Sequence, residues 1–205
     1  MSLYIPYEEM KSTIRQAMLK AGVPEDKAEI CAEIHTASSA DGVESHGLNR
    51  VPRFIDYLER GLVDPLAEPE IISSRGAVER IDGHLGIGIT NALFAADRAM
   101  ELDLAGTMMS CGKCTHEISE PRDGSCGGCT QIFITYDPNL FGDYEEVLKK
   151  TEARVAAVNA AHPSDPSRPV QWPGEGTAKR RAKSKERGVT ANEKVWEEVC
   201  RLAAR

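Results

Sequence analysis

The chain has 205 residues, which suits one or two domains and excludes a large multidomain enzyme. Its 25 lysines and arginines against 32 aspartates and glutamates give a net charge of −7 at pH 7, so a general electrostatic affinity for nucleic acid or anionic membranes is not expected. Hydrophobic residues at 41% and charged residues at 28% favour a folded globular chain over a disordered or fibrous one.

Three helices are predicted in the first part of the chain. Apolar residues recur at helical spacing over 10–21, and a glycine follows the last of them. A proline followed by two acidic residues begins a second helix, which we expect to span 24–42. A polar loop at 43–47 separates it from a third helix over 51–61, whose first turn holds a proline.

The middle of the chain is predicted to hold strands around one helix. β-Branched residues at 71–72 and 78–81, separated by a turn at 73–76, predict two short strands. An alanine-rich helix is expected over 90–104, and the apolar run 131–136 predicts a further buried strand.

Helices are predicted again near the C-terminus. Asp143 is expected to cap one that carries an apolar stripe, and the segment 161–176, rich in proline, serine and aspartate, is expected to be irregular. The last helix is predicted to begin at a capping box formed by Thr190 and Glu193. These elements together predict an α+β fold, with helices from both chain ends packed together and a small sheet between them in sequence.

Several short segments carry a resemblance that covers almost the whole chain. They are, in chain order, Ser45-His46-Gly47-Leu48-Asn49-Arg50 with Pro52-Arg53-Phe54, Asp82-Gly83-x-x-Gly86-x-Gly88, Cys114-Thr115-His116-Glu117-Ile118, Gln131-Ile132-Phe133-Ile134, Asp137-Pro138 with Phe141-Gly142, Pro173-Gly174-Glu175, and the ending 188–196. Together they resemble the malate/L-lactate dehydrogenase family. Its members include diketogulonate and sulfolactate dehydrogenases and use NAD or NADP without a Rossmann fold.

The resemblance implies hydride transfer between a nicotinamide cofactor, NAD or NADP, and a small 2-keto or 2-hydroxy acid. It assigns to His46 the protonation of the carbonyl oxygen, with Ser45 beside it in the proton relay; an imidazole suits this role because it titrates near neutral pH. It assigns to Arg50 the substrate carboxylate, which a guanidinium can bind with two parallel hydrogen bonds. Taken without the resemblance, a Ser-His-Gly loop is more often a helix cap and turn.

Cofactor binding is the implied role of Gly174, Glu175 and Gly176, because small residues let the backbone approach a dinucleotide. Read alone, this segment is a loop before a helix. The basic run that follows over 179–187 has no interleaved aromatic residue for stacking on bases, so we interpret it as a solvated helix face and expect no nucleic-acid partner.

The chain departs from the family in one respect. Members place a large middle domain between the alanine-rich helix and the Thr-His-Glu-Ile segment, and this domain is missing here, with a join predicted near 99–105. The aspartate that orients the imidazole in relatives lies in that domain, as do most cofactor contacts. We therefore expect an impaired or inactive oxidoreductase, with a helical domain from 1–62 and 142–205 and a reduced α/β segment over 63–141.

Two cysteine pairs support an alternative function. Cys111 with Cys114 and Cys126 with Cys129 have the spacing of paired zinc knuckles. By resemblance, the same stretch is an ordinary glycine-rich loop, and no metal ligand is assigned. The alternatives to an oxidoreductase are a zinc-stabilised binding domain and a noncatalytic interaction module.

Two expectations concern association and location. Relatives are dimers, and a surface that once faced a missing domain would expose apolar groups, so we expect a homodimer. The N-terminus has no basic segment followed by an apolar one, and no run of about eighteen apolar residues occurs, so we expect a cytoplasmic protein without membrane contact.

Overall fold

A computed structural model of the chain describes residues 2–76, 78–101, 107–110, 131–134, 139, 142–167, 169–172 and 174–205. Its helices are α1 (Tyr7–Lys20), α2 (Glu25–Ala40), the 3-10 helix η1 (Leu48–Arg50), α3 (Val51–Glu59), α4 (Gly88–Glu101), α5 (Tyr144–Asn159), α6 (Thr177–Arg187) and α7 (Glu193–Ala203). Its strands are β1 (Ser2–Ile5), β2 (Glu70–Arg75), β3 (Val78–Asp82), β4 (Thr107–Ser110), β5 (Gln131–Ile134) and β6 (Val189–Asn192). The fold is α+β, as the sequence predicts. None of the described helices is long and apolar enough to cross a membrane.

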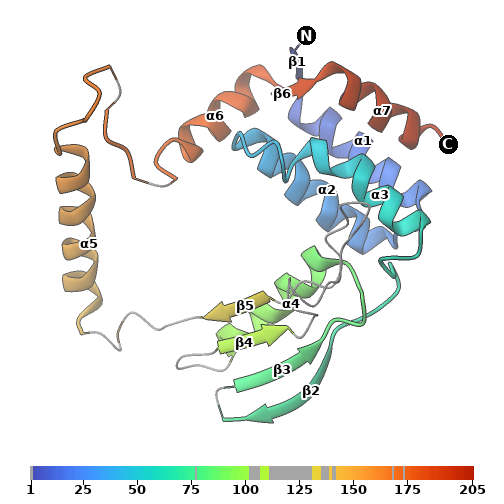
Figure 1. Cartoon of the computed structure of the whole chain (residues 1–205), viewed down its shortest axis with the longest axis horizontal. Coiled ribbons are helices and arrows are strands. Elements are labelled where there is room, and N and C mark those ends of the chain that lie inside the picture. The colour runs from blue at the N-terminus through green and yellow to red at the C-terminus, as the bar shows by residue number, and fades with distance from the viewer. Residues whose placement is uncertain are drawn as a thin grey trace.

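The main core lies between helices from both ends of the chain. α1 packs against α2 and α7, and α3 packs against α7 (Figure 1). The apolar stripe read from the sequence faces inward, since Met10, Ile14 and Met18 of α1 are fully buried. Val199 of α7 enters the same cluster. Burying such side chains is worth roughly 1.5–3 kcal/mol each, so this cluster is the main apolar contribution to folding.

A two-stranded antiparallel sheet joins the first and last segments of the chain. β1 pairs with β6, with Ser2 opposite Asn192 and Ile5 opposite Val189. Gly188 enters β6 with a φ of 96°, and a Cβ there would lie 3.1 Å from the carbonyl oxygen of Ile5. A side chain at position 188 would therefore meet the backbone of the paired strand. Neither strand was predicted, because four-residue strands with distant partners leave little local pattern.

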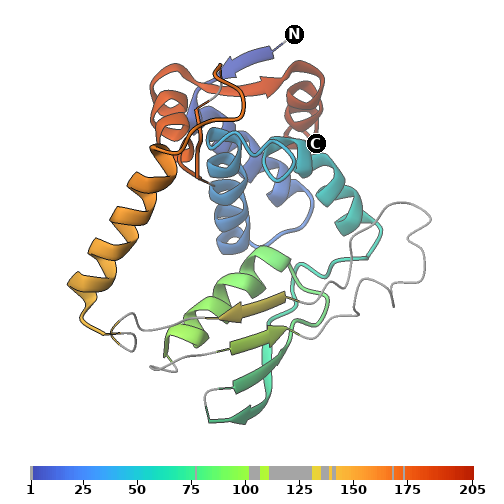
Figure 2. The ribbon, with the colours of Figure 1, turned by 60° about the vertical axis from the view of Figure 1, so that its left-hand side comes forward.

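The second sheet has the order β2-β3-β4-β5, and α4 lies across one face of it (Figure 2). β2 and β3 are antiparallel, β3 and β4 are parallel, and β4 and β5 are antiparallel. The sequence predicts strands where β2, β3 and β5 lie but misses β4, which lies between β3 and β5. The turn predicted at 73–76 is wrong over most of its length, because 73–75 continue β2 and pair with β3. Ile81 of β3 packs against Ala95 and Ala99 of α4. The alanine-rich helix is confirmed from Gly88 to Glu101, and the rest of its predicted range lies outside the described residues.

An ion pair links α4 to the four-stranded sheet. Glu79 of β3 is only 4% exposed, and its two carboxylate oxygens accept hydrogen bonds from Nε (3.1 Å) and Nη2 (2.7 Å) of Arg98. These hydrogen bonds hold the pKa of Glu79 below its usual value. Arg98 also contacts Glu101 within α4. A charge in so covered a position is stable only with its partner in place.

Helices α5 and α7 test the predicted caps. Asp143 caps α5 as predicted, because its Oδ1 accepts from the backbone of Glu145 (2.8 Å) and Glu146 (3.3 Å). The predicted capping box at Thr190 is wrong. Thr190 lies within β6, whose pairing with β1 extends to Asn192, so it is the Asn192 side chain that accepts from the first turn of α7.

Helix α5 buries none of its side chains. It stands apart from both the main helical group and the four-stranded sheet in Figure 1. The described residues 161–167 and 169–172, which lie between it and α6, form no helix or strand. The domain boundaries proposed from the sequence stay predictions.

Replacing Gly188 with alanine should destabilise the fold more than the same change at Gly22. Both glycines have positive φ values, but a Cβ at Gly22 meets nothing within 4 Å, whereas one at Gly188 meets the β1 backbone. We expect a loss of about 1 kcal/mol for Gly22→Ala and of about 2–3 kcal/mol for Gly188→Ala, measured by urea unfolding. Equal losses would show that the β1 contact is unimportant.

Candidate functional site

The Ser45–His46 pair lies in the loop between α2 and η1. Two consecutive turns shape this loop, with the His46 N–H donating to the Val43 carbonyl (3.1 Å) and the Gly47 N–H to the Glu44 carbonyl (3.3 Å). The Ser45 hydroxyl lies 2.9 Å from Nδ1 of His46, and both side chains are exposed. The structure thus places in hydrogen-bond contact the two residues predicted to form a proton relay.

Two residues of α2 hold the main chain of this loop. Nδ1 of His35 donates to the carbonyl of His46 at 2.9 Å. The Ser39 hydroxyl donates to the carbonyl of His35 (3.0 Å) and accepts from the N–H of Leu48 (2.7 Å). Because His35 and Ser39 are four residues apart in a helix, they lie on one face, and this face carries the loop.

Gly47 of the Ser-His-Gly segment is required by a close approach to the same face. A Cβ at this position would lie 2.1 Å from the Ser39 hydroxyl oxygen and 2.8 Å from the Ser39 backbone nitrogen. Such distances are far inside van der Waals contact, so a larger residue would lift the loop away from α2. The glycine therefore has a packing role next to His46.

Sequence reasoning missed His35. It is 5% exposed, and burial lowers its pKa; the hydrogen bond to His46 opposes this, and the nearby charges of Arg50 and His46 add to the lowering. Its Nε2 has no hydrogen-bond partner in the described part of the chain. Because a carbonyl only accepts, the neutral ring carries its proton on Nδ1. His35 and His46 are eleven residues apart, a spacing that no local sequence pattern connects. The only sequence signal was Ser39, four residues after His35, which indicated a polar face of the helix.

Arg50 ends η1, and its backbone N–H donates to the Gly47 carbonyl at 2.9 Å. Its charge lowers the pKa of His35, so the guanidinium lies near the same face of α2. Among the described residues, no group accepts a hydrogen bond from the Arg50 side chain. A guanidinium without an acceptor among the described residues is a group suited to a small carboxylate.

The predicted cofactor segment lies immediately before α6. Gly174 has a φ of 93°, which favours glycine. Oε1 of Glu175 accepts from the side chain of Asn159 at 3.0 Å, while Oε2 is buried and has no partner among the described residues. A Cβ at Gly176 would lie 2.5 Å from Nη1 of Arg180. Gly176 is therefore explained by the packing of Arg180 as well as by any ligand.

Helix α6 buries none of its side chains, but two of its arginines contact the end of α2. Nε of Arg180 donates to the carbonyl of Asp41 (2.8 Å), and Arg181 donates two hydrogen bonds to the Asp41 carboxylate (2.7 and 2.6 Å). These contacts give Arg180 and Arg181 a structural role on a helix face that is exposed, as the sequence predicts. They bring the segment before α6 to the end of α2, where the Ser45–His46 loop begins.

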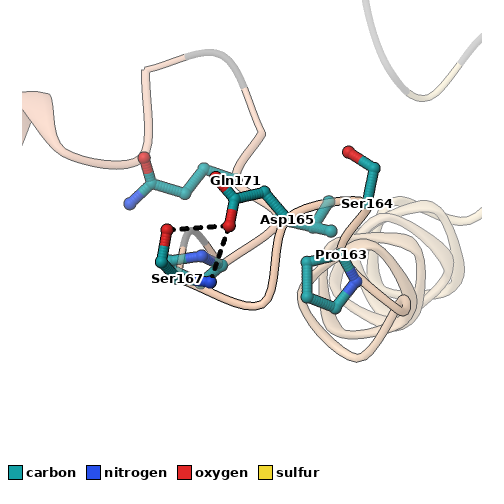
Figure 3. Close-up of a pocket in the computed structure, with 7 residues that line it drawn as sticks. Pro163, Ser164, Asp165, Ser167 and Gln171 are labelled. Atoms are coloured by element: carbon teal, nitrogen blue, oxygen red, sulfur yellow. Dashed lines mark hydrogen bonds between the residues drawn. The ribbon is translucent and has the colours of Figure 1, made fainter.

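Two surface hollows lie away from these residues. One of about 510 Å³ is formed by the irregular segment 163–171, where Asp165 accepts from the backbone N–H (2.9 Å) and hydroxyl (2.7 Å) of Ser167 (Figure 3). These hydrogen bonds lower the pKa of Asp165. The other, of about 470 Å³, lies between the β1–α1 junction and the end of α6. Neither is lined by His46, Arg50 or Glu175.

The cysteine pairs of the zinc alternative, Cys111, Cys114, Cys126 and Cys129, lie outside the described residues, as does His116. In the described ranges, no group of three or more histidine, cysteine, aspartate or glutamate residues could hold a metal ion. Cys31 is fully buried in the main core, which raises its pKa to about 12.

Comparison with known proteins gives matches over most of the chain. The malate/L-lactate dehydrogenase family matches in two segments, residues 5–106 and 102–200. A 2,3-diketo-L-gulonate reductase from Mannheimia succiniciproducens is 45% identical over 98 residues, which are 48% of this chain and 30% of that protein. The corresponding reductase from Pasteurella multocida is 44% identical over the same shares. The chain thus spans about 30% of the length of these curated relatives.

Solved structures share the fold at low sequence identity. Malate dehydrogenase from Pyrococcus horikoshii superposes with a TM-score of 0.82 at 15% identity, covering 100% of this chain and 95% of that one. Sulfolactate dehydrogenase from Methanocaldococcus jannaschii gives a TM-score of 0.75 at 16% identity and covers 98% of each chain. At these identities the likeness concerns the fold alone.

Burial of His35 makes stability depend on pH. Because its pKa is lower in the folded chain, the unfolded chain binds more protons just below pH 6.5, and the free energy of unfolding should fall as the pH drops through that range. His35→Gln keeps a donor but removes the titration. We expect it to reduce the slope of unfolding free energy against pH by about 1 kcal/mol per pH unit at most, measured by urea unfolding between pH 7 and 5.

A matched variant distinguishes the titration of His35 from any other effect of low pH on the free energy of unfolding. His162 is exposed and contacts only the Pro163 carbonyl among its described neighbours, so His162→Gln should leave the slope unchanged. A slope that is the same in His35→Gln and in the unmodified chain would contradict the role given to His35.

Proposed function

This chain belongs to the malate/L-lactate dehydrogenase family, and we propose that it is an oxidoreductase that interconverts a 2-keto acid and a 2-hydroxy acid with NAD or NADP, with much reduced activity in the chain as it stands. The relatives' names, 2,3-diketo-L-gulonate reductase among them, support a small keto acid as the substrate. The family match favours this function over a noncatalytic interaction module.

The observation that carries the proposal is the contact between the Ser45 hydroxyl and Nδ1 of His46. The cofactor, when bound, supplies the hydride to the carbonyl carbon of the keto acid. The carbonyl oxygen then needs a proton, which the protonated His46 ring can deliver from Nε2. While the ring is protonated, the Ser45 oxygen accepts from Nδ1. In the reverse direction Nε2 takes the proton from the hydroxyl group.

Arg50 is proposed to bind the substrate carboxylate. Its guanidinium has no acceptor among the described residues, and its charge acts on His35, the residue that holds the His46 carbonyl. Two parallel hydrogen bonds from Nη1 and Nη2, or from Nε and one Nη, would fix the carboxylate and thereby orient the adjacent carbonyl toward the imidazole. Lysine would supply the charge without this geometry.

The segment Gly174-Glu175-Gly176 is proposed to contact the cofactor. Oε2 of Glu175 is a buried acceptor without a partner in the described part of the chain, and a ribose hydroxyl is a donor that fits it. The positive φ at Gly174 favours glycine, so no side chain projects from the loop at this turn. These two features are consistent with a dinucleotide lying along the segment.

Reduced activity is proposed because the match to a curated relative covers only 30% of that relative's length. The two family matches overlap at 102–106, next to and partly inside the stretch 99–105 where the sequence predicts a join between two ends of a longer enzyme. Among the described residues, no carboxylate hydrogen-bonds the His46 ring in the way that the resemblance implies for an orienting aspartate. Weaker positioning of hydride donor, acceptor and proton donor lowers the rate steeply.

The catalytic proposal is tested by cofactor oxidation with a panel of 2-keto acids, including 2,3-diketo-L-gulonate, and with both NADH and NADPH. We expect a measurable rate well below that of ordinary dehydrogenases. His46→Gln should lower it about 10²–10⁴-fold because the proton donor is lost, and Arg50→Lys should act mainly on KM. Glu44→Gln, in the same loop, is the control and should leave the rate unchanged.

Two results would contradict this proposal in different ways. A rate typical of full-length dehydrogenases would overturn the claim of reduced activity. Neither turnover nor binding of NADH or NADPH by calorimetry would overturn the oxidoreductase function.

Self-association as a homodimer is part of the proposal. α5 exposes Leu148 and Val158, each 38% exposed, and α4 exposes Met100 at 63%. Apolar groups left open to water in this way are commonly covered by a second copy. Sedimentation equilibrium should give twice the chain mass, and Leu148→Lys combined with Val158→Lys should shift the protein toward monomer. A monomer at all concentrations would refute the dimer.

A further inference from the structure

We propose that Arg180 of α6 is a positioning residue that couples the Gly174-Glu175-Gly176 segment to the Ser45–His46 loop. Through it, a ligand bound at the first segment would alter the arrangement of the second. The coupling rests on the proposed cofactor role of the segment, whereas the positioning of the loop by Arg180 does not.

One end of the Arg180 side chain is fixed at the end of α2. Its Nε donates to the carbonyl of Asp41 at 2.8 Å. A Cβ at Gly42 would lie 3.2 Å from both Cδ and Nε of Arg180, so the glycine leaves room for the side chain to lie against the backbone. A cation beside the last carbonyls of a helix is also favoured by the helix dipole.

The other end of the same side chain lies against the segment before α6. A Cβ at Gly176 would lie 2.5 Å from Nη1 of Arg180, and Nη2 donates weakly to the Thr177 hydroxyl at 3.4 Å. The backbone N–H of Arg180 donates to the Gly176 carbonyl at 2.9 Å. The guanidinium therefore lies in the space that a side chain at position 176 would fill, and a shift of Gly176 toward Arg180 would displace it.

The path from Asp41 to His46 is short and hydrogen-bonded. The N–H of Gly42 donates to the Ser39 carbonyl (3.0 Å) and that of Val43 to the Ser38 carbonyl (2.9 Å). The turn that follows closes from Val43 to His46. With the His46 carbonyl held by His35, the loop has few freely rotating residues between the Arg180 contact and the imidazole.

Docking of α6 does not depend on Arg180 alone, which makes the residue testable. Arg181 binds both oxygens of the Asp41 carboxylate, and the Ser184 hydroxyl donates to the Ala40 carbonyl at 2.9 Å. A single hydrogen bond contributes about 0.5–1.5 kcal/mol, so loss of the exposed Arg180 should leave the fold intact. A change in the Ser45–His46 loop of an Arg180 variant can therefore be attributed to the loss of this side chain.

The test compares Arg180→Met with Lys183→Met. Both variants lose one positive charge from α6, but Lys183 is exposed and makes no contact with either loop among the described residues. NMR would record the ring resonances of His46, assigned with His46→Gln. Without ligand, Arg180→Met should shift and broaden them, whereas Lys183→Met should leave them as in the unmodified chain.

Saturating NADH is then added to the same three proteins. In the unmodified chain and in Lys183→Met, NADH should move the His46 resonances. In Arg180→Met, NADH should still bind, but the His46 response should fall about fivefold or more.

Each outcome decides one part of the proposal. Unchanged His46 resonances in ligand-free Arg180→Met would overturn the positioning role. An undiminished response to bound NADH in Arg180→Met would overturn the coupling. NADH that binds to none of the three proteins would overturn the cofactor role and with it the coupling, while the ligand-free spectra would still decide the positioning role.

Discussion

The end of α2 is the point on which the candidate site depends. A helix leaves its last carbonyls without partners inside the helix. At the end of α2 these carbonyls accept hydrogen bonds from two other segments. The loop itself supplies the N–H groups of Gly42 and Val43, and α6 supplies the hydroxyl of Ser184 and the guanidinium of Arg180. The loop that carries His46 is thus fixed by a segment more than a hundred residues further along the chain.

This arrangement needs both ends of the sequence in one core. The packing of α1 against α2 and α7, and the pairing of β1 with β6, bring the C-terminal segment back over the first helices. α6 immediately precedes β6, so the same pairing sets α6 beside α2. The four-stranded sheet with α4 is a separate group of elements and contributes no side chain to the contacts around His46 among the described residues.

The sequence was sufficient where the signal is local. Helical periodicity located α1, α2 and α3, and β-branched runs located β2, β3 and β5. Ser45 and His46 are adjacent in the chain, so their contact required no long-range information. What was missed is non-local: β1, β4 and β6 are defined by their partners, the start of α7 was displaced by strand pairing, and His35 and Arg180 act on residues that sequence spacing does not connect to them.

The ion pair of Glu79 and Arg98 restricts the amino-acid substitutions that this chain tolerates. The Glu79 carboxylate is covered on β3 and Arg98 reaches it from α4, so replacing the arginine leaves a covered charge uncompensated. Replacing the carboxylate leaves a smaller defect, because the Arg98 side chain is 28% exposed and keeps its contact with Glu101. Position 79 can therefore change before position 98, for instance toward an apolar side chain that packs under the helix without any charge.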